Sequence, residues 1–116
     1  MESVPFKVKE VDGGFSEAHG SAYVEGEDLV LDVEKAFLGR FMRKSTLFRI
    51  ELTDLDTVRY KKGLVNDRVD IRTRPMERLA KVPGVTEGTL SVVVSKKNRE
   101  QLNVLLDRLD LWRTDN

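Results

Sequence analysis

The sequence predicts one mainly β domain of about seven short antiparallel strands, closed by a single C-terminal helix. Three observations support this prediction: apolar and polar residues alternate over most of the chain, Gly and Pro interrupt the runs, and the period changes near the C-terminus. A length of 116 residues suits one domain, and a composition of 40% hydrophobic and 34% charged residues is typical of a soluble globular protein.

The first predicted hairpin joins two strands of alternating pattern. In residues 28–37, every second residue from Leu29 to Val33 is apolar, and residues 15–26 show a similar period of two. Between them, residues 25–28 read Glu-Gly-Glu-Asp, a composition typical of a tight turn. This pattern places one face of both strands in a core and the other in water.

Further strands follow at short intervals. A second hairpin is expected to turn at Gly39-Arg40 and to return along residues 45–52. Shorter strands are predicted around residues 58–60, 69–73 and 89–95, while residues 76–82 fit either a short strand or a helical turn. The expected turns and breaks lie at Thr53-Asp54, Asn66-Asp67, Arg74-Pro75 and Val82-Pro83-Gly84-Val85.

The C-terminal segment has a helical period. Its leucines are spaced i, i+3, i+4 and i+7, which forms one apolar stripe, and either Ser95 or Asn98 is a suitable N-cap. The stripe consists of Leu102, Leu105, Leu106 and Leu109. We expect this helix to close the open end of the strand layer.

The domain is expected to span residues 15–112, with residues 1–14 as an N-terminal extension or edge strand and residues 113–116 as a tail. The first residues lack the apolar stretch of a signal peptide, and no apolar run approaches the roughly 20 residues of a transmembrane helix. The absence of cysteine fits a reducing compartment. A cytoplasmic location is therefore expected.

The charges balance overall but are unevenly distributed. The chain has 20 basic and 20 acidic residues, which disfavours a nucleic-acid ligand. Residues 1–36 hold 3 basic and 9 acidic side chains, whereas residues 37–81 hold 12 and 6. This asymmetry indicates either a binding face or the pairing of acidic and basic strands within one sheet, and we favour the pairing.

The order of these segments resembles that of bacterial proteins of the pleckstrin-homology (PH)-like superfold. The hairpins are followed by IELTDLDTVRYKKG, then VPG, then TLSVVVSKKNREQLNVLLDRL, and the resemblance covers residues 15–112. It implies a PH-like barrel of about seven antiparallel strands in two nearly orthogonal sheets, capped by one C-terminal α-helix. Such domains bind phosphoinositides, peptides or proteins. Residues 25–28 are acidic where phosphoinositide-binding members are basic, so no inositol-phosphate site is expected.

The hairpin tip at residues 36–44 is the first candidate site. Its apolar and basic side chains are suited to the surface of an anionic membrane or to a protein partner, and they also fit a tip that folds back onto the barrel. The tentative binding residues are Phe37, Leu38, Arg40, Phe41, Arg43 and Lys44.

A weaker candidate is an anion site at the start of the helix. Lys96, Lys97 and Arg99 lie where acidic residues are usually preferred, so they either concentrate positive charge or form a solvated edge. The run Arg59-Tyr60-Lys61-Lys62 is better explained as a strand with Tyr60 facing inward.

No motif in the sequence indicates catalysis, a cofactor or a metal. The single histidine, His19, is expected at the surface or rim, and Asp54 with Asp56 fits a capped turn better than a carboxylate pair. A hydrolase would need a pocket that gathers His19, a carboxylate and a hydroxyl. The sequence therefore predicts a non-catalytic binding module for a protein partner or a second copy of itself, with anionic-membrane binding through residues 36–44 as the alternative.

Overall fold

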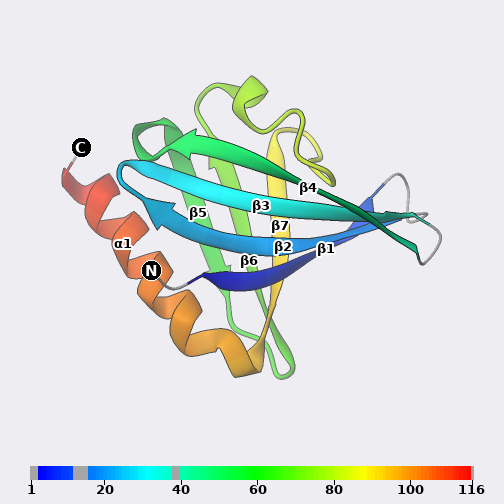
Figure 1. The fold of residues 1–116 in the computed structure, drawn as a ribbon. Coiled ribbons are helices and arrows are strands. Elements are labelled where there is room, and N and C mark those ends of the chain that lie inside the picture. Colours follow the sequence, from blue (N-terminus) through cyan, green and yellow to red (C-terminus); the bar gives the residue numbers. More distant parts are fainter. Residues whose placement is uncertain (1–2, 12–15, 38–39, 116) are drawn as a thin grey trace.

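The computed structural model describes the backbone of residues 3–11, 16–37 and 40–115 and the side chains of residues 3–8, 17–35 and 45–109. In this part of the chain, seven antiparallel strands form one sheet in the order β4-β3-β2-β1-β7-β6-β5, and one helix follows (Figure 1). The mainly β prediction is confirmed. The elements are β1 Val4–Val11, β2 Ser16–Glu25, β3 Asp28–Phe37, β4 Arg40–Glu51, β5 Leu55–Lys61, β6 Asn66–Thr73, β7 Thr89–Ser95 and α1 Arg99–Asp115.

The turns agree with the sequence in most places. The hairpin of β2 and β3 turns at Gly26, which has a φ of 62°, and the amide of Val85 donates to the carbonyl of Val82 across Pro83-Gly84. A 3₁₀ turn, η2 (Leu52–Asp54), separates β4 from β5, and another, η3 (Met76–Arg78), resolves the ambiguous segment as a helical turn. The expected turn at Asn66-Asp67 was wrong, because both residues begin β6.

The two ends of the chain contribute more structure than expected. Strand β1 lies between β2 and β7, so residues 4–11 form an interior strand and not an extension or an edge. The reason is its own alternation, since Val4, Phe6 and Val8 are all buried. At the other end, α1 continues to Asp115, three residues beyond the boundary expected at residue 112.

A seam divides the sheet between β1 and β7. Among the described residues, these two strands pair at one position, Lys7 with Val93. In Figure 1, β1–β4 run across the view, whereas β5–β7 run from top to bottom, so the strand direction changes at the seam. On β2, the backbone of β3 comes close to Gly20, where an added Cβ would lie 1.9 Å from the carbonyl oxygen of Asp32.

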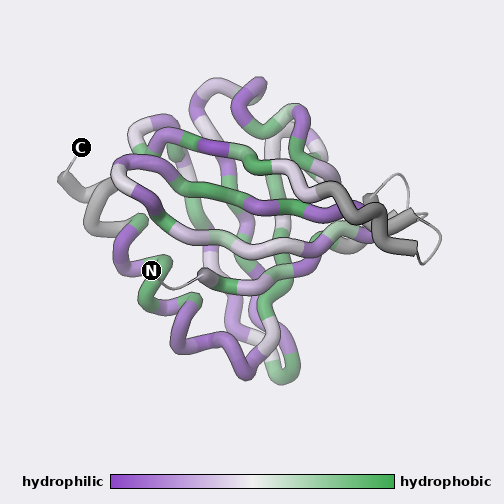
Figure 2. The backbone as a smooth tube through the Cα atoms, viewed as in Figure 1, coloured by the Kyte–Doolittle hydropathy of each residue, from purple (hydrophilic) through white to green (hydrophobic). Residues whose placement is uncertain are grey.

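The core lies between the concave face of the sheet and α1. Apolar residues alternate with polar ones along the strands (Figure 2), and Leu102, Leu105 and Leu109 of the helix are buried against them. The predicted leucine stripe is thus confirmed as core for these three residues, and Leu106 is partly buried against them. The apolar space left between helix and sheet is about 20 Å³, which is too small for any ligand larger than water.

Acidic and basic strands do pair within the sheet. Strand β4 lies next to β3, and the Arg49 guanidinium on β4 lies 2.8 Å from Glu25 and 3.6 Å from Asp28 at the β2–β3 turn. These ion pairs support the pairing interpretation of the uneven charge distribution. Each is at the surface, where such a pair adds little to stability.

Candidate functional site

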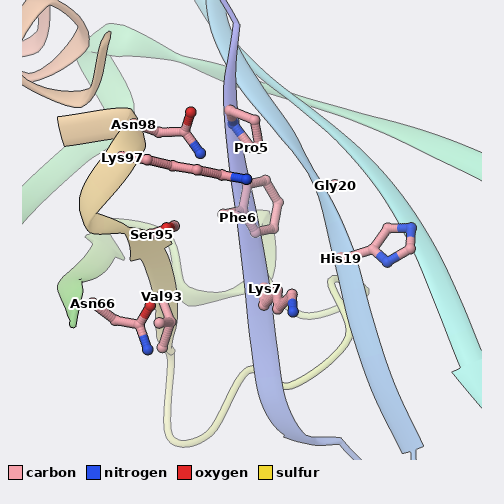
Figure 3. Close-up of a pocket in the computed structure, with 10 residues that line it drawn as sticks. All are labelled: Pro5, Phe6, Lys7, His19, Gly20, Asn66, Val93, Ser95, Lys97 and Asn98. Carbon is pink, nitrogen blue, oxygen red and sulfur yellow. The ribbon is translucent and has the colours of Figure 1, made fainter. Parts of the chain in front are cut away.

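A hollow with both polar and apolar walls opens beside the seam, between β1 and β7. Its volume is about 460 Å³. The strands β1, β2 and β7 form its floor and sides, and the 3₁₀ turn η4 (Lys96–Asn98), which leads into α1, forms its rim (Figure 3). This seam hollow is lined by Pro5, Phe6, Lys7, His19, Gly20, Asn66, Val93, Ser95, Lys97 and Asn98.

Two lysines from opposite sides make the seam hollow cationic. Lys7 projects from β1, and Lys97 extends from the rim towards β1 in Figure 3; both side chains are exposed. The side-chain amides of Asn66 and Asn98 and the hydroxyl of Ser95 also line the hollow. Ammonium groups attract carboxylates, while amides and hydroxyls can both donate and accept hydrogen bonds. This arrangement suits an anionic ligand with a polar backbone.

His19 stands at the far side of the seam hollow on β2. Its Nε2 atom lies 3.0 Å from Oε2 of Glu34, its register partner on β3. The side chain is 38% exposed, as expected for a rim residue. Across the residues 3–8, 17–35 and 45–109, no group of three His, Asp or Glu side chains is arranged to hold a metal ion.

The cluster around Asp67 fixes one side of the rim. The Asp67 side chain is completely buried, and Arg99 donates to both of its carboxylate oxygens over 2.8 Å. The hydroxyl of Tyr60 and the amide of Gly63 also donate to this carboxylate, over 2.8 and 3.1 Å. We call these four residues the Asp67 cluster. It ties the start of α1 to the loop between β5 and β6.

The electrostatics of the Asp67 cluster follow from these contacts. The hydrogen bonds from Arg99 hold the pKa of Asp67 far below its ordinary value, although burial acts in the opposite direction. Conversely, the hydrogen bond to Asp67 raises the pKa of the Tyr60 hydroxyl, with burial acting in the same direction. The carboxylate is therefore ionised and fully hydrogen-bonded, which is the signature of a positioning group that has no proton to exchange near neutral pH.

The structure separates the three residues predicted as an anion site. Lys97 lines the seam hollow, Lys96 is exposed beside the β5–β6 loop, and Arg99 turns inward to Asp67. The amide of Lys96 donates to the carbonyl of Val65 over 3.1 Å, which holds the loop against η4. Only Lys97 of the three therefore faces the hollow.

The other predicted site cannot be placed. The side chains of Phe37, Arg40, Phe41, Arg43 and Lys44, and all of Leu38, lie outside the described residues. Binding through the tip at residues 36–44 stays a prediction.

Several residues of the site were missed from the sequence. Lys7 was assigned to an extension, and Asp67 was assigned to a turn. A signal for Asp67 was present, since the alternation of Val69, Ile71 and Thr73 extends back by two residues to position 67 and places it on the buried face. Tyr60 was expected to face inward but is 39% exposed, with its hydroxyl directed to Asp67.

No helix in the described part of the chain has an apolar stretch long enough to cross a bilayer. Comparison of the chain with protein-family models, with curated proteins and with solved structures finds no match in any of the three.

Proposed function

We propose that this chain is a non-catalytic binding module and that its ligand is an acidic segment of a partner protein, bound in the seam hollow. One observation carries the proposal: an open hollow of about 460 Å³ is lined by Lys7 from β1, by Lys97 from η4, and by further amide and hydroxyl groups. The two ammonium groups attract carboxylates from either side, and the neutral polar groups suit the backbone that connects those carboxylates.

The polar side chains in the walls favour a peptide over a small, wholly apolar ligand. Pockets for small molecules are lined mainly by apolar side chains. Here six of the ten lining residues are polar or charged: Lys7, His19, Asn66, Ser95, Lys97 and Asn98.

The strand edges at the seam favour an extended segment. Away from the Lys7–Val93 pair, no pairing between β1 and β7 is present among the described residues. The facing backbones of both strands therefore border the hollow, and an extended peptide can add to such an edge.

We further propose that the scaffold is a PH-like barrel. The strand order β4-β3-β2-β1-β7-β6-β5 supports this, because β1–β4 and β5–β7 are two meanders of consecutive strands that join at one pair within the described residues. The close approach at Gly20 supports it too, since glycine at such a point lets a strand bend sharply. In this proposal the meanders are the two sheets of the barrel and α1 is the capping helix.

The test is an NMR titration of the full ¹⁵N-labelled chain with an octaglutamate peptide. We expect shift changes at the amides of Phe6, Lys7 and residues 93–98. Reversing both cations, Lys7→Glu with Lys97→Glu, should weaken binding by about tenfold or more. A matched pair, Arg72→Glu with Lys81→Glu, makes the same change in net charge at exposed positions that do not line the hollow and should leave binding within about twofold.

Three results would contradict the proposal. Octaglutamate could leave the spectrum unchanged, or its binding could survive the Lys7 and Lys97 substitutions. Free glutamate, at an equal concentration of carboxylate, could produce the same shifts; the hollow would then bind single anions and not a segment.

A second copy of this chain is one source of such carboxylates. Glu27 is exposed at the turn between β2 and β3, whereas Glu25 and Asp28 beside it are paired with Arg49. Light scattering separates the two sources: a mass above 13.3 kDa that returns to 13.3 kDa in the Lys7→Glu, Lys97→Glu variant identifies a second copy. A mass of 13.3 kDa for the unchanged chain excludes a second copy as the source under the conditions measured.

A further inference from the structure

Two aliphatic residues stand in solvent at the loop between β5 and β6. Leu64 is 93% exposed and Val65 is 72% exposed, the two highest values among the large hydrophobic residues that the structure describes. We call residues 61–65 the β5–β6 tip. In Figure 1 this tip lies beside the start of α1. Single exposed aliphatic residues are common at protein surfaces, so the exposure becomes informative only through what surrounds it.

The backbone on both sides of Leu64 is tied down. The amide of Gly63 donates to Asp67, and Arg99 donates to the carbonyl of Gly63 over 2.9 Å. On the other side, the carbonyl of Val65 accepts from the amide of Lys96. The conformation is also specific to glycine, since a Cβ on Gly63 would lie 2.0 Å from the carbonyl oxygen of Asn66. These backbone hydrogen bonds on both sides of Leu64 therefore hold the two aliphatic side chains outward.

The ion pair that ties the tip supports a role in positioning. Burying a carboxylate with a guanidinium is a weak source of stability, because both groups lose their hydration and an apolar pair of similar volume often serves as well. The Asp67 cluster holds the conformation of the tip in a way that apolar residues would not, because its charged groups hydrogen-bond directly to the amide and the carbonyl of Gly63.

Positive charge surrounds the tip. Residues 59–68 and 95–100 together contain seven basic and two acidic side chains. One acidic residue, Asp67, is buried and paired with Arg99, and the other, Glu100, is exposed on the first turn of α1. Lys61, Lys62 and Lys96 are all exposed. The tip thus combines a small apolar point with an excess of cations.

We propose that the β5–β6 tip docks on an anionic membrane surface, with Leu64 and Val65 in the interfacial layer and Lys61, Lys62 and Lys96 against the headgroups. A bilayer interface accepts a small convex apolar point and adds attraction for each nearby lysine. Two aliphatic side chains on a convex turn provide much less area than the roughly 800 Å² that each partner buries in a stable protein interface. This inference goes beyond the proposed function, since it concerns a different surface and a different ligand.

Vesicle co-sedimentation tests the inference with the full chain. We expect binding to phosphatidylcholine vesicles that contain phosphatidylserine and no binding to phosphatidylcholine alone. Each lysine near an anionic surface contributes roughly fivefold to binding, so Lys61→Ala with Lys62→Ala should weaken it about 25-fold. Leu64→Ser with Val65→Ser should weaken it about tenfold.

Matched variants separate the tip from general effects. Leu47→Ser removes another exposed leucine, on β4, and Arg72→Ala with Lys81→Ala removes two exposed cations away from the tip. Both should bind vesicles within about twofold of the unchanged chain. For the charge variant, the reason is that salt screens exposed charges that are more than roughly 10 Å apart. Since all of these side chains are exposed, circular dichroism should show the same fold in every variant.

A labelled cysteine reports insertion directly. The chain contains no cysteine, so Val65→Cys and Leu47→Cys each give one site for an environment-sensitive fluorophore. The probe at position 65 should shift to the blue with anionic vesicles, while the probe at position 47 should not change.

The inference fails on any of three results: no sedimentation with anionic vesicles, unchanged sedimentation after Leu64→Ser with Val65→Ser, or competition by soluble glycerophosphoserine at millimolar concentration. A failure of this inference can be told apart from a failure of the proposed function. The titration of the Lys7→Glu, Lys97→Glu variant with octaglutamate tests only the seam hollow.

Discussion

Arg99 and Asp67 form a two-point ion pair, with Nε and Nη2 of Arg99 donating to the two carboxylate oxygens of Asp67 over 2.8 Å each. The pair spans 32 residues and joins the first turn of α1 to the start of β6. Because the Asp67 side chain has no exposed surface, its charge depends on Arg99 for compensation. The pair consequently sets where the helix starts relative to the sheet and to the β5–β6 tip.

Replacing one partner of this ion pair should lower the free energy of unfolding more than replacing both partners. Arg99→Met leaves a buried carboxylate with only Tyr60 and Gly63 as partners, so the urea midpoint of unfolding should fall. Adding Asp67→Leu to Arg99→Met removes the unpaired buried carboxylate and should recover at least half of the lost free energy of unfolding. A double variant that is less stable than Arg99→Met would show that the pair is a net source of stability.

The stability should also depend on pH through Asp67. Its pKa in the folded chain lies far below the ordinary value of 3.8, so the folded state keeps this carboxylate ionised where the unfolded state binds a proton. The contribution is therefore complete above about pH 4 and is lost as the pH falls towards the folded pKa. The free energy of unfolding, measured from pH 7 to pH 2, should fall less steeply for Asp67→Asn than for the unchanged chain.

Some acid sensitivity should remain in the Asp67→Asn variant. The pKa of Asp70 is also lowered, by hydrogen bonds from Ser91 and Arg68 that outweigh its burial. Equal slopes for the variant and the unchanged chain would show that Asp67 does not control acid unfolding.

Gly20 should tolerate no side chain. An alanine there would place its Cβ 1.9 Å from the carbonyl oxygen of Asp32, a backbone atom that cannot move aside without disturbing the β2–β3 pairing. We expect Gly20→Ala to lower the free energy of unfolding by about 1–3 kcal/mol, measured by chemical unfolding. Gly26→Ala is the control, because Gly26 has a φ of 62° but open space around it, and its cost should be about 1 kcal/mol. Equal losses would show that the close approach at Gly20 is relaxed in solution.

The helix should depend on its buried stripe and not on its outer face. Leu109 is 2% exposed, and Leu109→Ala should lower the free energy of unfolding by about 2–5 kcal/mol. Val104 is 51% exposed on the same helix, so Val104→Ala should change it by less than about 0.5 kcal/mol. Thermal or urea unfolding measures both. A small loss at Leu109 would mean that the helix contributes little to the core.

Patterns of period two and period 3.6 were enough to predict most of the fold. They identified the hairpin at Gly26, the strand at residues 89–95 and the leucine stripe, because burial on one face leaves a direct mark on the sequence. They failed at Asp67, where a polar residue occupies a buried position and its partner, Arg99, is far away in the chain. Local propensity favours a turn at Asn66-Asp67, but the tertiary pairing of Asp67 with Arg99 places both residues in a strand.

The candidate site was less predictable than the fold. Lys97 was chosen from its place at the start of the helix, but its counterpart Lys7 could not be found, because the pairing of β1 with β7 is a long-range contact that no local pattern encodes. The seam hollow exists only where these two strands separate, so it is a property of the assembled sheet. Of the β5–β6 tip, only Lys61 and Lys62 were interpreted, as part of a charged strand; sequence does not reveal how far Leu64 projects.

Among the residues that the structure describes, β1 and β7 pair only between Lys7 and Val93, and this has a consequence for how the chain folds. Each of the two strand meanders consists of consecutive neighbours whose contacts are short in sequence, whereas the seam connects residues 86 positions apart. Closing so long a loop costs entropy before any contact compensates for it, so the meanders should form early and the seam should close last, together with the docking of α1. Phi-value analysis should accordingly find values near zero at Lys7 and Val93, which would place the pairing of β1 with β7 after the rate-limiting barrier.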